Sequence, residues 1–194
     1  MPFGLTQARG GGAFNERKAT QLAALLLQCA GGHMRHIKLI KLIYVVDRMA
    51  LERRGFAVSG DRYYNLPKGP IVSEILNLVK GTSAREEGIW ADSITWDGKY
   101  DVALVHDPGR DELAEFEVDL VNEVMDTFGG WDWGALLDYC HDLPEWVAPN
   151  PDEYGEARLP LPAERILEVL HKPSAQIEHH RRRAQAEAFL ASLG

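Results

Sequence analysis

A chain of 194 residues with 45% hydrophobic and 9% aromatic side chains can bury one self-sufficient core, and this composition argues against an intrinsically disordered protein. A formal net charge of −8 disfavours non-specific nucleic-acid binding, which depends on clustered Lys and Arg. Neither a secretory signal segment nor an apolar run long enough to span a membrane is visible, so we expect a cytoplasmic protein.

The charge is distributed unevenly along the chain. Residues 1–64 carry ten Lys and Arg against four Asp and Glu, whereas residues 107–158 carry two against fifteen. We expect part of this asymmetry to cancel when the two segments pack together, and any acidic face that remains to attract a basic partner. A solvated face is the ordinary interpretation of the acidic segment, and mimicry of a nucleic acid is the alternative.

The N-terminal third of the chain predicts two helices. Residues 1–14 are rich in glycine and indicate a flexible leader. Apolar residues spaced by three and four predict a helix over 16–30, with Asn15 as its N-cap. The next helix, over 34–54, is apolar around most of its circumference and ends at Gly55. We therefore expect other helices to surround it.

Turn signals divide the rest of the chain. Pro70 favours the first turn of a helix that stops near Gly81. The Asp97-Gly98 pair between extended runs over 90–96 and 99–105 is a strong hairpin signal. Further helices are predicted over 111–128, 133–141, 163–171 and 174–192, and residues 144–162 predict a proline-rich extended strap.

These elements predict a mainly α protein. It is expected to be a single compact helical domain around a buried central helix, with one small β-hairpin and a C-terminal helical extension. We place the flexible leader at 1–14, the domain at 15–172 and the C-terminal helical tail at 173–194.

Six short motifs in a fixed order along the chain carry a resemblance to a known family. They are Lys38–Tyr44, Gly60–Tyr63, Lys68–Val72, Asp97–Asp101, His141–Trp146 and Leu161–Leu167. Together they resemble the Panacea domain, also called the SocA-like antitoxin domain, of bacterial toxin–antitoxin pairs and phage-associated proteins. The resemblance implies a non-enzymatic antitoxin that neutralises a cognate protein toxin by direct binding. In one branch of the family the antitoxin instead delivers its toxin to an ATP-dependent protease.

The resemblance assigns a structural role to seven motif residues. They are Lys38, Lys41, Tyr44, Gly60, Asp61, Gly69 and Pro70. We interpret Lys38 and Lys41 as the water-facing edge of an otherwise apolar helix, with their aliphatic stems lying along apolar neighbours. Internal pairing of these lysines with Asp47, Asp61 or the acidic segment is the alternative.

Candidate partner-binding residues lie outside the expected central helix. We select aromatic and arginine side chains because these types dominate the energetics of protein interfaces. They are Tyr63, Tyr64, Tyr154, Arg181, Arg182, Arg183 and Phe189. The tail over 173–194 buries little apolar surface, so it either packs back on the domain or docks a partner or a second copy of the chain.

No metal or cofactor site is predicted. The histidine pairs are His33 with His36, and His179 with His180. The first pair lacks a neighbouring Cys or acid, and adjacent residues on a helix diverge, whereas zinc needs three or four converging ligands. The two cysteines, Cys29 and Cys140, lie in apolar helical segments and predict buried free thiols rather than a disulfide.

Two other functional classes remain as alternatives. A phage-associated or regulatory protein that contacts nucleic acid would expose a basic face. An enzyme with an unrecognised site would bring Lys38, Asp61, Tyr63 and His141 together around a deep pocket.

Overall fold

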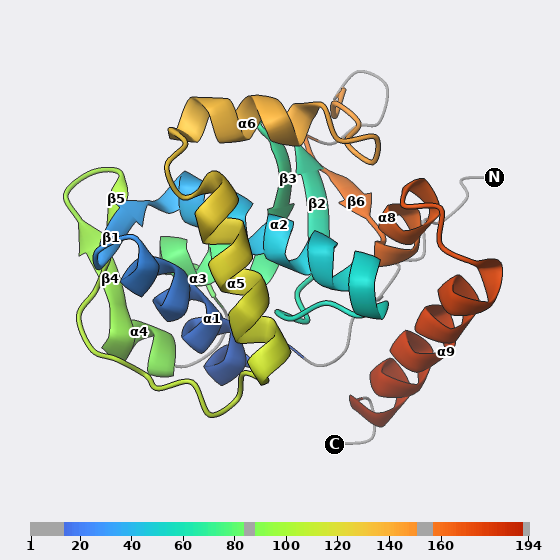
Figure 1. The fold of residues 1–194 in the computed structure, drawn as a ribbon, viewed down its shortest axis with the longest axis horizontal. Coiled ribbons are helices and arrows are strands. Elements are labelled where there is room, and N and C mark those ends of the chain that lie inside the picture. Colours follow the sequence, from blue (N-terminus) through green and yellow to red (C-terminus); the bar gives the residue numbers. More distant parts are fainter. Residues whose placement is uncertain (1–13, 84–87, 151–156, 192–194) are drawn as a thin grey trace.

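The computed structural model describes residues 14–83, 88–150 and 157–191 (Figure 1). Within these ranges the protein is mainly helical and also contains two small antiparallel sheets. The helices are α1 (Glu16–Cys29), α2 (His36–Arg54), α3 (Ser73–Lys80), α4 (Ile89–Ser93), α5 (Glu115–Phe128), α6 (Trp133–His141), α8 (Ala163–Val169) and α9 (Ser174–Ala191). The strands are β1 (His33–Arg35), β2 (Tyr63–Leu66), β3 (Gly69–Val72), β4 (Ile94–Asp97), β5 (Asp101–Leu104) and β6 (Leu159–Leu161).

Helix α2 has neighbours on most of its surface. Every residue over 39–47 is buried, as are Ala50 and Leu51. Helices α1, α5, α6 and α8 and strand β3 pack against it, and Figure 1 shows α6 and α5 on two of its sides. These neighbours are what a helix without a polar stripe requires, because its apolar side chains must leave water in every direction.

The first sheet contains the predicted hairpin and one strand that was not predicted. Strands β4 and β5 pair antiparallel with Asp97 opposite Asp101, which confirms the Asp97-Gly98 turn. Strand β1 then pairs with the other side of β5, so the strand order is β1-β5-β4. We expected the second helix to begin at Met34, but this residue lies in β1 because its partners come from a distant part of the sequence.

The second sheet also departs from the expectation of one small hairpin. The expected helix start at Pro70 is wrong: Gly69–Val72 forms β3, and α3 begins only at Ser73. Strand β3 pairs with β2, and β6 from the proline-rich strap pairs with the opposite edge of β2. A proline fits an extended strand because its fixed φ lies within the extended range and its missing N–H can fall on an edge.

The C-terminal helix packs back on the domain. Helix α9 contacts α8, Ala184 is buried, and Ile177 packs against the core. Figure 1 places α9 at one end of the molecule, next to α8. Of the two alternatives for the tail, the structure therefore has the packed one, although Phe189 remains 63% exposed.

Both cysteines are free, and Cys140 is buried as expected. The expectation is wrong for Cys29, which is exposed because it occupies the last turn of α1, where that helix leaves the core. Across the described ranges, no helix combines the length and hydrophobicity that crossing a membrane requires.

Candidate functional site

Asp47 holds the loop that follows α2. Its buried carboxylate accepts hydrogen bonds from the main-chain N–H groups of Val58 and Ser59 at 2.9 and 2.8 Å. It also accepts hydrogen bonds from the hydroxyl groups of Ser59 and Tyr63, the latter at 3.0 Å. Burial raises the pKa of Asp47, and these donors oppose the rise. Tyr63 is only 5% exposed within this network, which leaves little of its side chain for the predicted contact with a partner.

Asp61 caps α3 from the preceding turn. Its carboxylate accepts hydrogen bonds from the N–H groups of Glu74 and Ile75, each at 2.9 Å, and from that of Arg62 at 2.6 Å. Gly60, with φ of 64°, provides the left-handed turn that directs the carboxylate toward the helix start. Burial raises the pKa of Asp61 to about 7, although the N–H groups favour its charged form.

Lys41 connects α2 to β3. It is 1% exposed, and its Nζ donates a hydrogen bond to the carbonyl oxygen of Pro70 at 2.6 Å. A Cβ at Gly69, where φ is 90°, would lie 2.8 Å from that Nζ. Burial lowers the pKa of Lys41 to about 8. The expected water-facing position of Lys41 is therefore wrong, and the half-buried Lys38 likewise bonds internally, to the carbonyl of Gly129 at 2.6 Å.

Another buried network connects α2 to the segment after α6. Glu145 is 1% exposed and accepts hydrogen bonds from Tyr44 Oη at 2.9 Å and from Arg48 Nε at 2.6 Å. The main-chain carbonyl of Glu145 also accepts a hydrogen bond from Asn65 at 3.3 Å. The neighbouring Trp146 donates its indole N–H to the carbonyl of Leu66 at 3.1 Å. Segments far apart in the sequence thus meet at these polar groups.

The charge asymmetry of the sequence is partly cancelled inside the molecule. Four ion pairs join the basic N-terminal segment to the acidic one and confirm this expectation. They are Arg17–Asp111 at 3.0 Å, Lys18–Glu117 at 2.7 Å, Arg48–Glu145 at 2.6 Å and Arg53–Glu123 at 2.6 Å. Because these Lys and Arg side chains of α1 and α2 pair with carboxylates of the acidic segment, less unpaired basic charge is available to bind a nucleic acid.

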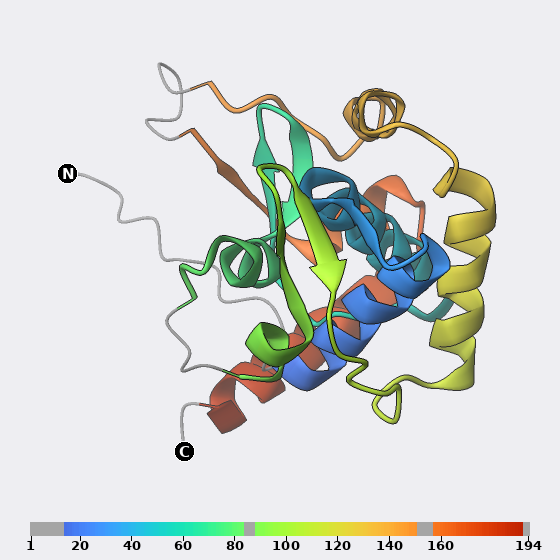
Figure 2. The same cartoon turned by 90° about the vertical axis from the view of Figure 1, so that its left-hand side faces the viewer.

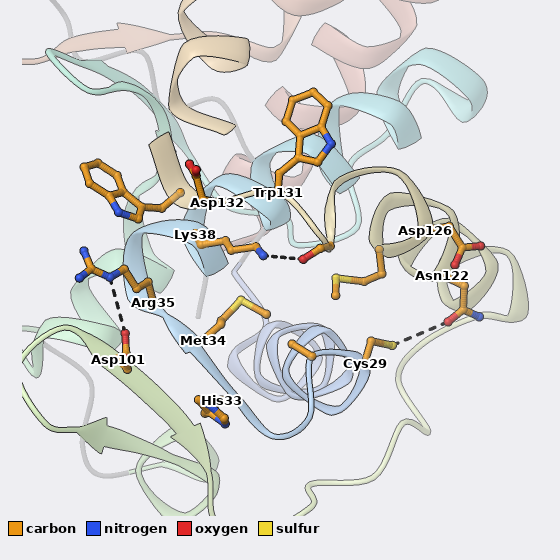
Figure 3. A pocket seen from close by; sticks show the side chains of 14 residues that line it. Cys29, His33, Met34, Arg35, Lys38, Asp101, Asn122, Asp126, Trp131 and Asp132 are labelled. Carbon is orange, nitrogen blue, oxygen red and sulfur yellow. Dashed lines mark hydrogen bonds and ion pairs between the residues drawn. The ribbon is translucent and has the colours of Figure 1, made fainter. Parts of the chain in front are cut away.

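An open groove of about 780 Å³ lies between α1, β1 and α5 (Figure 3). Figure 2 shows α1 and α5 side by side, next to the sheet that contains β1. Cys29 and Asn122 line one wall, and their side chains are 3.9 Å apart. Met34 and Met125 contribute apolar surface, and Lys38 crosses the upper part of Figure 3. The groove therefore mixes polar and apolar walls.

Aromatic side chains form the rim of this groove. Trp131 and Trp133 are 38% and 40% exposed and flank Asp132, which caps α6. The Arg35 guanidinium lies 5.6 Å from the ring centre of Trp133 and 5.1 Å from that of Tyr100. We call Arg35, Tyr100, Trp131 and Trp133 the aromatic rim. None of these four residues is among the partner-binding residues selected from the sequence.

The selected partner-binding residues lie elsewhere. Tyr64 borders a depression of about 240 Å³ between β2, β6 and α9, beneath the guanidinium of Arg158 at 4.7 Å. Arg181 and Arg182 both pair with Glu178 on their own helix. Arg183 lies 5.6 Å from the ring centre of Phe56.

Two further predictions concern Tyr154 and the alternative enzyme site. Tyr154 lies outside the described residues. The pocket expected for an enzyme is not formed, because Lys38 lines the groove whereas Asp61 and Tyr63 line a separate depression beside α9.

Metal binding and thiol reactivity depend on His, Cys, Asp and Glu side chains, among them the buried Cys140 and its neighbour His141. Among the described residues, no group of three or more His, Cys, Asp or Glu side chains is arranged to hold a metal ion. Burial raises the pKa of Cys140 to about 11, so this thiol stays protonated and unreactive near neutral pH. The adjacent His141 ring stacks on Trp146, with ring centres 4.2 Å apart.

Comparison with known protein families identifies the family of this chain. A family model described as "Antitoxin SocA-like, Panacea domain" matches residues 39–147, which is more than half of the chain. Searches of curated proteins and of solved structures found no significant match. The matched range begins in α2 and ends after Trp146, so it contains the buried contacts of Asp47, Asp61, Lys41 and Glu145 and the α5 side of the groove, but not α1 or β1.

Proposed function

Because this chain belongs to the antitoxin SocA-like, Panacea domain family, we propose that it is an antitoxin that neutralises a cognate protein toxin by direct binding. The observation that carries the proposal is the family match combined with the use of the motif residues. Lys41, Tyr44 and Asp61 are buried and bond to main-chain or side-chain groups of the fold. Because these motif residues stabilise the fold from inside, we infer that exposed residues bind the partner protein.

Surface features support a role in binding proteins. The aromatic rim presents tryptophan, tyrosine and arginine, which are the residue types that carry most of the free energy at protein interfaces. A standard interface buries about 800 Å² of surface on each partner. The exposed surface area that lines the groove is smaller than this. We therefore place the toxin over the groove and its rim. Tyr64 and the arginines of α9 form the second candidate surface.

The test of the proposal is co-expression with the product of the adjacent gene. That product is expected to arrest growth when expressed alone and to be tolerated when this chain is present. Co-purification of the two full-length proteins would show that neutralisation is direct. Growth arrest that persists despite soluble antitoxin, or relief without any complex, would contradict the proposal.

A more specific version of this proposal is that the chain delivers the toxin to an ATP-dependent protease. Under this form the half-life of the toxin falls when the antitoxin is present, and the fall requires an ATP-dependent protease. A stable toxin held in a stoichiometric complex indicates simple capture. Salt-dependent binding of the purified chain to DNA would instead favour the nucleic-acid alternative.

A further inference from the structure

Strand β1 has one paired edge and one unpaired edge. Its register places His33, Met34 and Arg35 opposite Ala103, Val102 and Asp101 of β5. The N–H of Leu104 bonds to the carbonyl of Gly32, and the N–H of His36 bonds to the carbonyl of Tyr100. Main-chain groups of an antiparallel strand alternate in direction. The main-chain N–H and C=O of Met34 therefore point toward β5. The N–H and C=O of His33 and the N–H of Arg35 point away from it.

The unpaired edge of β1 borders the groove. His33, Met34 and Arg35 all line it, and no other strand in the described ranges pairs with this edge. Figure 3 shows β1 along one side of the groove and α5 along the other. The edge strand β6 of the second sheet differs, because its central residue is Pro160, which has no N–H to offer.

An extended segment suits this groove better than a helix does. A helix satisfies its main-chain groups internally and offers nothing to the outward groups of β1, whereas an extended chain can bond to them. The groove volume of about 780 Å³ falls within the usual range for sites that enclose a small ligand or a short segment. The aromatic rim supplies flat surfaces for the side chains of such a segment.

The charges in the groove indicate the polarity of the segment. The two cations are engaged: Arg35 pairs with Asp101 at 4.0 Å, and Lys38 bonds to Gly129. Asp132 lines the groove but its carboxylate caps α6, whereas Asp126 lines it and forms no ion pair with another described residue. A Lys or Arg on the incoming segment would find a carboxylate there.

We propose that the free edge of β1 binds an extended, lysine- or arginine-bearing segment of the partner protein by strand addition, with Trp133 as its aromatic anchor and Asp126 as its charge contact. This inference rests on the proposed function, since it describes how the toxin would be held. It adds the conformation and the charge of the part that is recognised.

The test uses a random-peptide library displayed on phage and selected against the full-length chain. Enriched peptides are synthesised and then methylated at one main-chain nitrogen at a time. Because the C=O of His33 is the acceptor that the outward edge of β1 offers, strand addition predicts one sensitive nitrogen: methylation there lowers affinity at least tenfold, and methylation of the two neighbouring nitrogens leaves it nearly unchanged. Hydrogen exchange at the amides of His33 and Arg35 should slow when the peptide binds. Equal sensitivity at neighbouring nitrogens, unchanged exchange at both amides, or a helical bound peptide overturns the proposal.

Three variants locate the binding surface. Trp133→Ala is expected to weaken the peptide about tenfold or more, and Asp126→Asn is expected to weaken it several-fold and reduce its salt dependence. Asp138→Asn, an exposed carboxylate on α6 outside the groove, is the control and should leave affinity unchanged. Circular dichroism shows whether each variant is folded. Selected peptides that are insensitive to both groove variants, or a library that yields no binder, also count against the proposal.

The outcome is separable from that of the proposed function. If the chain relieves toxicity in co-expression but binds no peptide along β1, the antitoxin function stands and the binding mode is wrong. If peptides bind along β1 but the toxin is not neutralised, the edge recognises a different partner.

Discussion

Glu145→Ala is expected to lower the free energy of unfolding by about 3–5 kcal/mol, because it breaks a buried ion pair and leaves the second charge behind. The Glu145 side chain is 0% exposed and that of Arg48 is 14% exposed, so water screens the guanidinium poorly once the carboxylate has gone. The hydroxyl of Tyr44 loses its acceptor in the same step, which adds about 1 kcal/mol. Single domains are stable by only about 5–15 kcal/mol, so this loss is a large share of the total.

The assay is urea unfolding followed by circular dichroism, in which the midpoint falls while the dependence on denaturant is unchanged. Arg53–Glu123 provides the matched control, because it also joins an arginine of α2 to a later glutamate but is 41% and 46% exposed. Glu123→Ala should therefore barely move the midpoint. Combining Arg48→Met with Glu145→Leu should recover most of the lost stability, because no buried charge then lacks a partner. A Glu145→Ala midpoint as close to wild type as the control would refute this reasoning.

Three further predictions concern other contacts. Lys41 has a folded pKa of about 8, below its ordinary 10.5, so the unfolded chain holds more protons between these values. The free energy of unfolding should therefore rise between about pH 8 and 9, by up to 1.4 kcal/mol per pH unit, before the raised pKa of Cys140 opposes the rise above pH 9; Lys41→Met should flatten it in urea titrations. Gly69→Ala should cost about 1–3 kcal/mol in the same assay, because φ is 90° and the new Cβ meets Lys41; an unchanged midpoint contradicts the geometry. Deletion of 173–194 should leave a soluble, cooperatively unfolding domain with weaker toxin capture, and aggregation in gel filtration would show instead that α9 belongs to the core.

Local signals predicted several helix ends, although the extended run expected over 90–96 is wrong in its first part, which belongs to helix α4. Asn15 accepts the N–H of Lys18 at the start of α1, and Asp132 accepts that of Ala135 at the start of α6. Gly55 adopts the left-handed conformation that ends α2. Each of these features depends on residues within about one helical turn, so the order of residue types is sufficient to predict it. The Asp97-Gly98 turn is predictable for the same reason.

Pairings between distant segments could not be predicted in the same way. Met34 shortly precedes the apolar helical run that begins at Ile37, and only the approach of β5 makes it part of a strand. Pro70 is compatible with a helix start and with an extended strand, and β2 decides between them.

The amino-acid sequence by itself determined which segments form most of the helices, several helix ends, the hairpin turn and the family, because short-range capping and motif order encode them. Only the tertiary structure decided that Lys41 is buried rather than exposed, since its acceptor at Pro70 lies 29 residues away. The groove and its aromatic rim depend likewise on elements that chain folding brings together. Burial and hydrogen bonding are properties of neighbours in space, and the linear order of residues does not specify those neighbours directly.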